Sequence, residues 1–208
     1  MRRSDEVRVI GITGGVGAGK SEVLTYLSKH CNCRIIMADK VAHQLEEPGE
    51  RCYEPLKALL GSAVLTPAGT IDRRKMAERI FQDDEILQKV NGIVHPAVKE
   101  YLLEQIAYEK RAGQIDYLFI EAALLIEDGY SNIVDELWYI HADVSVRRQR
   151  LKQARGYADE KIDSILRGQL PEEAFYEHCR VVIENNGTFA DVYQQIEKEL
   201  GEYQCQKQ

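Results

Sequence analysis

The chain has 208 residues, of which 44% are hydrophobic and 29% are charged, and its formal net charge is -7. This length and composition indicate one globular domain with a substantial core, running over residues 1–208. The acidic balance argues against a surface built broadly for DNA, RNA or anionic lipid, so we expect neither nucleic acid nor a membrane as a partner.

Nothing in the chain indicates export or membrane insertion. The N-terminus is charged, and glycines soon interrupt the apolar segment that follows it, so we expect no signal peptide. The longest apolar runs are strand-sized, well short of the roughly 20 residues that cross a bilayer. The five cysteines have neither zinc-finger nor Cys-x-x-Cys redox spacing, which indicates reduced thiols. These features predict a cytoplasmic protein.

Short apolar runs separated by longer stretches of helical periodicity dominate the pattern. The runs predict buried strands at 7–12, 34–37, 117–120, 137–140 and, more briefly, 181–183. Strands that alternate with helices are joined by crossover connections, which favour a mostly parallel sheet covered on both faces. The predicted fold class is therefore α/β.

The segment 40–115 is far longer than a single crossover helix requires, so we expect a helical insertion there. Its periodicity predicts a helix over 72–81, and Pro96 is expected in the first turn of a helix that runs to about Ala112. The core then consists of about 1–39 and 116–208.

The last helix is expected over about 188–203, because apolar residues recur there at helical spacing. Val192, Ile196 and Leu200 would form its buried face. The chain contains no internal repeat or low-complexity tract.

The strongest motif is Gly14-x-x-x-x-Gly19-Lys20-Ser21, which follows the first predicted strand and opens a predicted helix over 20–29. Residues without a side chain allow a tight turn whose backbone N–H groups point at phosphate oxygens. The helix N-terminus adds a partial positive charge. We expect ATP to bind Gly14, Gly15, Val16, Gly17, Ala18, Gly19, Lys20, Ser21 and Glu22.

Two side chains of this motif suit phosphoryl transfer. Lys20 is expected to reach the β- and γ-phosphates as a catalytic residue, and the Ser21 hydroxyl to coordinate Mg²⁺. Glu121 directly follows the third predicted strand, where it could hold a magnesium-bound water or be structural. The chain lacks an Asn-Lys-x-Asp motif and a Leu-Ser-Gly-Gly-Gln-like segment, which counts against a GTPase and an ABC ATPase. A small kinase remains.

The segment from Ile10 to Ser21 resembles the opening of dephospho-coenzyme A kinases. Further segments keep the order and spacing of that family over nearly the whole chain: 37–44, 47–49, 69–73, 80–81, 94–96, 124–127 and 185–187. The resemblance implies a P-loop kinase fold with a five-stranded sheet, a helical substrate-binding insertion and a lid. It also implies transfer of the γ-phosphate of ATP to the ribose 3′-hydroxyl of dephospho-coenzyme A. We expect the chain to be a monomer or small homo-oligomer.

The resemblance further implies roles for acceptor-side residues. Asp39 matches the second acid of the family's Asp-Ala-Asp segment and is expected to be the catalytic carboxylate beside the substrate hydroxyl. Without the resemblance, an Asp after a strand is more often a helix N-cap. His95 and Arg73 are substrate-binding candidates; a cap or core histidine and a solvated helix face are the alternatives.

An arginine-rich helix ending near Gly156 is expected to form the lid, at about 144–170. Guanidinium groups suit this position because they stay charged and grip phosphate oxygens through two hydrogen bonds. Arg150 matches the family's catalytic, ATP-binding lid arginine, and residues 147, 150 and 154 would share one helical face. Arg148 and Lys152 fit a solvated basic face.

The chain departs from the family at two informative positions. Met37 stands where the family usually has an acid, and Ala154 stands where it has a second lid arginine, so Arg155 is expected to bind ATP instead. The segment 185–187 either shapes the adenine pocket or forms a plain turn. The alternatives for function are another small-molecule or nucleotide kinase, or a regulatory protein that binds nucleotide without transfer.

Overall fold

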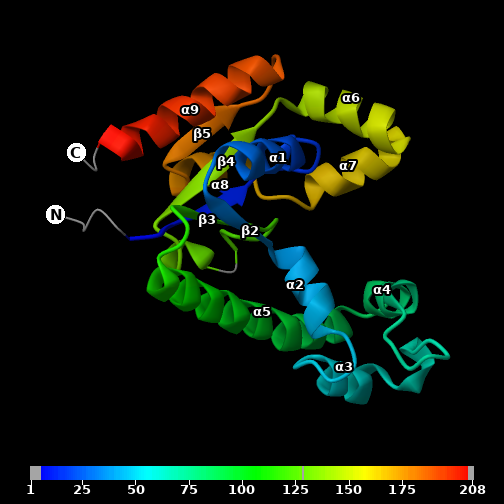
Figure 1. The fold of residues 1–208 in the computed structure, drawn as a ribbon. Coiled ribbons are helices and arrows are strands. Elements are labelled where there is room, and N and C mark those ends of the chain that lie inside the picture. The colour runs from blue at the N-terminus through cyan, green and yellow to red at the C-terminus, as the bar shows by residue number, and fades with distance from the viewer. Residues whose placement is uncertain (1–5, 128, 206–208) are drawn as a thin grey trace. The chain divides into compact units, whose positions relative to one another are not determined.

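The computed structural model describes residues 6–127 and 129–205, and the chain divides into two compact units. One unit combines the N-terminal segment through Ile35 with the segment from Glu109 onward, and the other is Ile36–Tyr108. The first unit contains most of the sheet, and the second is mainly helical (Figure 1).

The described part of the chain forms a five-stranded sheet in the order β2-β3-β1-β4-β5. The strands are β1 (Arg8–Thr13), β2 (Cys33–Met37), β3 (Tyr117–Glu121), β4 (Glu136–His141) and β5 (Val181–Glu184). Strand β1 pairs in parallel with β3 and β4, and β4 pairs in parallel with β5. Strands β3 and β4 are buried along their whole length, as expected of a sheet covered on both faces. The α/β class and all of the predicted strands are confirmed.

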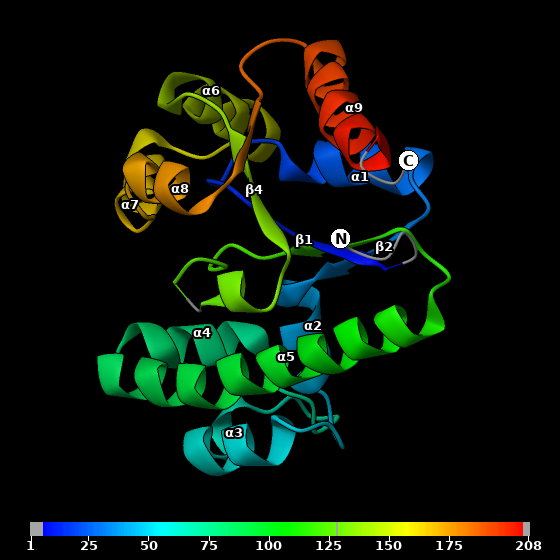
Figure 2. The same cartoon turned by 90° about the vertical axis from the view of Figure 1, so that its left-hand side faces the viewer.

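The helices of the first unit are α1 (Lys20–His30), α6 (Val144–Arg155), α7 (Asp159–Arg167), α8 (Glu172–His178) and α9 (Phe189–Cys205), with a short 3-10 turn, η2 (Tyr130–Asn132). Helices α1 and α9 lie side by side (Figures 1 and 2), and the rings of Tyr26 and Tyr193 stack with centroids 4.1 Å apart. Tyr26 also donates a hydrogen bond of 2.6 Å to Glu197, which raises the pKa of the Tyr26 phenol to about 12.

The face of α9 that packs inward is the one predicted from its periodicity. Val192, Ile196 and Leu200 are all buried. Residues four apart lie on one side of a helix, so this spacing directs the apolar stripe toward the core.

The second unit contains α2 (Ala38–Leu45), α3 (Tyr53–Leu60), η1 (Ser62–Val64), α4 (Arg73–Phe81) and most of α5 (Asp84–Ala112). Arg51, just before α3, is held to α5 by two hydrogen bonds to Glu104, of 2.8 and 2.9 Å, and by an ion pair with Glu100. Leu56 and Leu102 are fully buried. Helices α2 to α5 thus make up most of the segment between β2 and β3, as predicted.

The prediction that Pro96 occupies a first helical turn is wrong, because α5 begins at Asp84 and passes through Pro96. Proline lacks an N–H and its ring crowds the carbonyl four residues earlier, which here belongs to Gly92. Packing of one apolar face stabilises the helix on both sides of Pro96. The buried residues of this face are four apart: Val90, Val94, Val98, Leu102 and Ile106. No helix of the described ranges, α5 included, combines the length and apolar character needed to cross a membrane.

The cysteines whose side chains are described are free thiols: Cys31, Cys33, Cys52 and Cys179. Burial raises the pKa of the Cys33 thiol to about 11 and that of the Cys179 thiol to about 12. Because the thiolate is the reactive form, these two side chains are poor nucleophiles at neutral pH. The prediction of unpaired thiols is confirmed for all four.

The start of α4 provides a test of local stability. The Asp72 carboxylate accepts hydrogen bonds from the backbone N–H groups of Arg74, at 3.0 Å, and Lys75, at 3.2 Å. We expect Asp72→Ala to destabilise α4 by about 1 kcal/mol, because both donors lose this cap. Asp72→Asn keeps an acceptor and is the matched control. Hydrogen exchange of the α4 amides measures the effect, and equal protection in the two variants would contradict it.

Candidate active site

The loop between β1 and α1 turns through backbone conformations that side chains disfavour. Gly14, Gly17 and Gly19 have φ angles of 148°, 85° and 98°. A Cβ atom on Gly14 would overlap the carbonyl oxygen of Ile140, and one on Gly19 would overlap the side-chain amide of Asn185. Glycine is required at these positions both by the dihedrals and by the space. The result is a tight backbone turn that leads into a helix N-terminus, as phosphate binding requires.

Lys20, the first residue of α1, folds back over this loop. Its Nζ donates a hydrogen bond of 2.7 Å to the carbonyl oxygen of Gly14 and lies 3.7 Å from Oε1 of Glu121. Glu121 is the last residue of β3 and is only 7% exposed. An ammonium group and a buried carboxylate therefore meet at the β1–α1 loop.

A magnesium ion at this loop would depend on ligands from outside the protein. The described residues contain no cluster of three or more His, Cys, Asp or Glu side chains able to hold a metal. Ser21 is exposed in the first turn of α1, and the Glu121 carboxylate lies near the same loop. One hydroxyl and one nearby carboxylate fit Mg²⁺ that keeps several waters and takes further oxygens from a nucleotide.

Arg150 and Asn185 contact the loop close to α1. Arg150 donates hydrogen bonds to the carbonyl oxygens of Asn185, at 2.9 Å, and Ala18, at 3.3 Å. Asn185 is fully buried, and its side-chain amide donates to the same Ala18 carbonyl at 2.7 Å. A buried amide is costly to leave unpaired, so Asn185 fixes the end of β5 to the loop. Segment 185–187 is thus more than a plain turn.

A charged cluster supports the strand ends that lead into this part of the site. The buried imidazole of His141, at the end of β4, has Nδ1 2.6 Å from Oε2 of Glu184 and Nε2 2.9 Å from Oε1 of Glu172. The backbone N–H of Asn185 donates to the His141 carbonyl at 2.8 Å. These contacts connect β4, β5 and α8 just before Asn185.

Two further arginines of α6 bear on the site, and the expected binding of ATP by Arg155 stays a prediction. Arg155 ends α6, and its guanidinium lies 5.9 Å from the ring centroid of Tyr157, with no polar contact to the glycine loop in the described ranges. Arg147, which no sequence motif assigns to the site, donates a hydrogen bond of 3.0 Å from Nε to the Val16 carbonyl. Its position on the helical face of Arg150 was the signal in the sequence that could have identified it.

Arg148 and Lys152 are partly exposed, as expected of a solvated basic face, but acids of α7 pair with them. Arg148 pairs with Asp159, at 2.9 Å, and with Asp163, and Lys152 pairs with Asp159 at 2.8 Å. The acids lie on or at the start of α7, which runs beside α6 (Figure 2). These side chains therefore join the two lid helices, a contact between elements that single-helix periodicity does not reveal.

Asp39 and His95 belong to the second unit. Asp39 is exposed in the first turn of α2, whose N-cap is Met37, so the N-cap interpretation of Asp39 is wrong. His95 is half-buried in the interior of α5, so it does not cap a helix. Their expected roles at the substrate stay predictions.

Arg73 is the first residue of α4. Its Nε lies 3.9 Å from Oε2 of Glu46, and its Nη2 lies 4.0 Å from Oε1 of Glu47. Glu46 is only 7% exposed, and burial raises the pKa of its carboxyl while the charge of Arg73 acts in the opposite direction. Half of the Arg73 side chain remains exposed. A substrate anion could share this guanidinium with the two acids.

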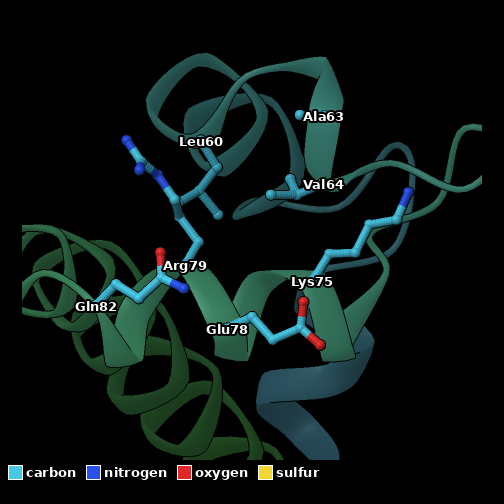
Figure 3. A pocket seen from close by; sticks show the side chains of 7 residues that line it. All are labelled: Leu60, Ala63, Val64, Lys75, Glu78, Arg79 and Gln82. Carbon is cyan, nitrogen blue, oxygen red and sulfur yellow. The ribbon is translucent and has the colours of Figure 1, made fainter.

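A pocket of about 420 Å³ opens in the second unit between the end of α3, η1 and α4. Figure 3 shows apolar side chains on one side and charged or polar side chains from α4 and its C-cap on the other. The lining residues are Leu60, Ala63, Val64, Lys75, Glu78, Arg79 and Gln82. None of the predicted substrate-binding residues is among them, and we assign the pocket no ligand.

The conformation of Gly19 generates a prediction about nucleotide binding. We expect both Gly19→Ala and Gly113→Ala to strain the backbone by roughly 1–2 kcal/mol, because both glycines have positive φ angles. Only at Gly19 does the new Cβ meet Asn185; Gly113 has open space around it. Gly19→Ala alone should therefore weaken ATP binding, at least about tenfold. Isothermal titration calorimetry measures both affinities, and an equal affinity in the two variants would refute this explanation.

Comparisons with known proteins agree with this geometry. A family model described as dephospho-CoA kinase matches residues 8–191. The dephospho-CoA kinase of Shouchella clausii is 34% identical over 188 residues, covering 90% of this chain and 94% of that protein. The dephospho-CoA kinase of Geobacter sulfurreducens is 32% identical over 192 residues, covering 92% and 96%.

Solved structures share the fold. TT1252 from Thermus thermophilus matches with a TM-score of 0.79 and 29% identity, covering 95% of this chain and 98% of that one. A shikimate kinase from Acinetobacter baumannii has a TM-score of 0.54 and 13% identity, covering 94% of each chain, which is a likeness of fold alone. The family model and the two relatives show that the chain belongs to the dephospho-CoA kinase family.

Proposed function

We propose that this chain transfers the γ-phosphoryl group of ATP to the ribose 3′-hydroxyl of dephospho-coenzyme A, yielding coenzyme A and ADP. Membership of the dephospho-CoA kinase family supports the acceptor. The observation that carries the transfer chemistry is Lys20 folded over the glycine loop, 3.7 Å from the buried Glu121 carboxylate. Phosphoryl transfer needs mainly alignment and charge stabilisation, and these groups supply charge at a phosphate-binding turn.

ATP would be bound through the backbone of residues 14–22, with Lys20 on the β- and γ-phosphates. Mg²⁺, when bound, would bridge phosphate oxygens and offset their negative charge. The Ser21 hydroxyl would hold it directly, and Glu121 would hold it through a water. Arg150 would keep the loop end and Asn185 in position beside the nucleotide, in line with its hydrogen bonds to Ala18 and Asn185.

Asp39 would accept the proton of the acceptor hydroxyl. In the described part of the chain its carboxylate neither caps a helix nor forms an ion pair, and its side chain is exposed. An uncommitted carboxylate can act as a general base once the acceptor lies within hydrogen-bond reach. Arg73 and His95 would contact dephospho-coenzyme A, Arg73 by charge attraction to its phosphates.

A coupled assay of ADP release tests the acceptor. We expect turnover with dephospho-coenzyme A and none above background with nucleoside monophosphates, gluconate or shikimate. Turnover with one of these alone would identify another kinase. ATP binding without turnover on any acceptor would instead support a regulatory nucleotide-binding protein.

The role of Lys20 is tested by Lys20→Ala. We expect turnover to fall by at least about a hundredfold, because a charge that stabilises the transferring group is lost. Lys29→Ala removes an exposed lysine near the other end of α1 and should leave turnover unchanged. Similar rates for Lys20→Ala and the native chain would rule the lysine out.

The role of Asp39 is tested by Asp39→Asn, which removes the basic oxygen at nearly constant size. We expect at least about a hundredfold loss of turnover with little change in ATP affinity, as loss of a general base produces. Asp84→Asn, at another exposed acid in a first helical turn of the same unit, is the control. An active Asp39→Asn enzyme would refute the assignment of the base.

A further inference from the structure

Arg147 lies against the glycine loop but has no role in the function proposed above. Its Nε donates a hydrogen bond of 3.0 Å to the Val16 carbonyl. A Cβ atom added to Gly15 would lie 2.6 Å from a terminal nitrogen of the same guanidinium. The absence of a side chain at Gly15 therefore gives this arginine its place on the loop.

The polar partners that the structure gives this guanidinium are neutral. They are the Val16 carbonyl and the side-chain oxygen of Gln169. Within the described ranges no carboxylate forms an ion pair with Arg147, whereas the next residue, Arg148, pairs with Asp159 and Asp163.

Burial lowers the pKa of the Arg147 guanidinium, and smaller Coulomb effects of Tyr139 and Glu172 act in the opposite direction. Arginine nevertheless stays protonated in proteins. A partly desolvated cation without a counter-ion is costly, and an anion at the loop would offset that cost.

The position of Arg147 along the loop indicates which anion it would meet. This inference rests on the proposed function, in which the loop binds ATP. In loops of this kind the lysine reaches the β- and γ-phosphates. Here Lys20 is hydrogen-bonded to Gly14, and Arg147 lies against the next residue, Gly15. Arg150 instead contacts Ala18 and Asn185, next to the start of α1. The two arginines therefore serve different ends of the loop.

We propose that Arg147 is a further catalytic residue, which binds the γ-phosphoryl oxygens of ATP, and that Gln169 is its positioning residue. In the transfer, the acceptor oxygen bonds to the γ-phosphorus, and the bond from that phosphorus to the β–γ bridging oxygen breaks with its electron pair remaining on ADP. The hydroxyl proton passes to Asp39. The planar fork of Arg147 stabilises the oxygens of the migrating group.

Nucleotide binding isolates the γ-phosphate contact, because ADP lacks that group. For Arg147→Ala we expect the affinity for a non-hydrolysable ATP analogue with Mg²⁺ to fall at least about tenfold, and the affinity for ADP to change less than about threefold. The turnover number with dephospho-coenzyme A should fall by about a hundredfold to a thousandfold. Arg148→Ala, which removes a guanidinium paired with α7, is the matched control and should leave the ratio of the two affinities unchanged.

Two further variants keep the test decisive if Arg147→Ala does not fold. Arg147→Lys keeps the charge without the planar fork, and should retain analogue binding better than turnover. Gln169→Glu places a carboxylate on the guanidinium and neutralises it, so turnover should fall at least about tenfold while ADP affinity is retained. An equal loss of ADP and analogue affinity, or an unchanged turnover number in these variants, would overturn the proposal.

The binding measurement contains no acceptor, which separates this proposal from the proposed function. If the native chain fails to phosphorylate dephospho-coenzyme A but Arg147→Ala discriminates between ADP and the analogue, the acceptor is wrong and the role of Arg147 in binding stands. If the native chain is active and Arg147→Ala is equally active, the role of Arg147 alone is refuted.

Discussion

The close packing of the glycine loop against its neighbours is the constraint on which the candidate site depends. Gly14 lies against the backbone of β4, Gly15 against the guanidinium of Arg147, and Gly19 against Asn185. A side chain at any of these positions would displace a strand end, a lid arginine or the segment after β5. The same absence of side chains serves two purposes, because it leaves backbone for phosphate to approach and lets the lid reach that backbone.

The parallel sheet explains why residues distant in sequence meet at this loop. The loop follows β1, Glu121 ends β3, and Asn185 follows β5. In a parallel sheet the carboxyl ends of the strands share one edge, which is where ligands bind in open α/β folds. The cluster of His141, Glu172 and Glu184 holds the ends of β4 and β5 together, and the sheet thereby positions side chains that no short motif contains.

Charge around the loop is arranged differently from charge along the rest of the lid. Arg148 and Lys152 are neutralised by acids at the start of and within α7, and such exposed pairs contribute little to stability. Arg147 and Arg150 instead donate to carbonyl and amide oxygens. On a chain with a net charge of -7, positive charge that is not neutralised by acids is thus kept where an anionic nucleotide would bind. Helix α6 therefore pairs with α7 through Arg148 and Lys152, and contacts the glycine loop through Arg147 and Arg150.

The sequence by itself determined the features that depend on local pattern. These are the α/β class, the strands, the helix after Gly19, and the glycine loop with Lys20. They depend on the spacing of apolar residues and on backbone dihedrals that only glycine adopts easily, and both can be read from residues close together in the chain. Only the tertiary structure decided the contacts of Arg147, the burial of Asn185 and the passage of α5 through Pro96. The first two depend on which strand and helix ends meet in space, and the last on packing that outweighs the intrinsic helix-breaking tendency of proline.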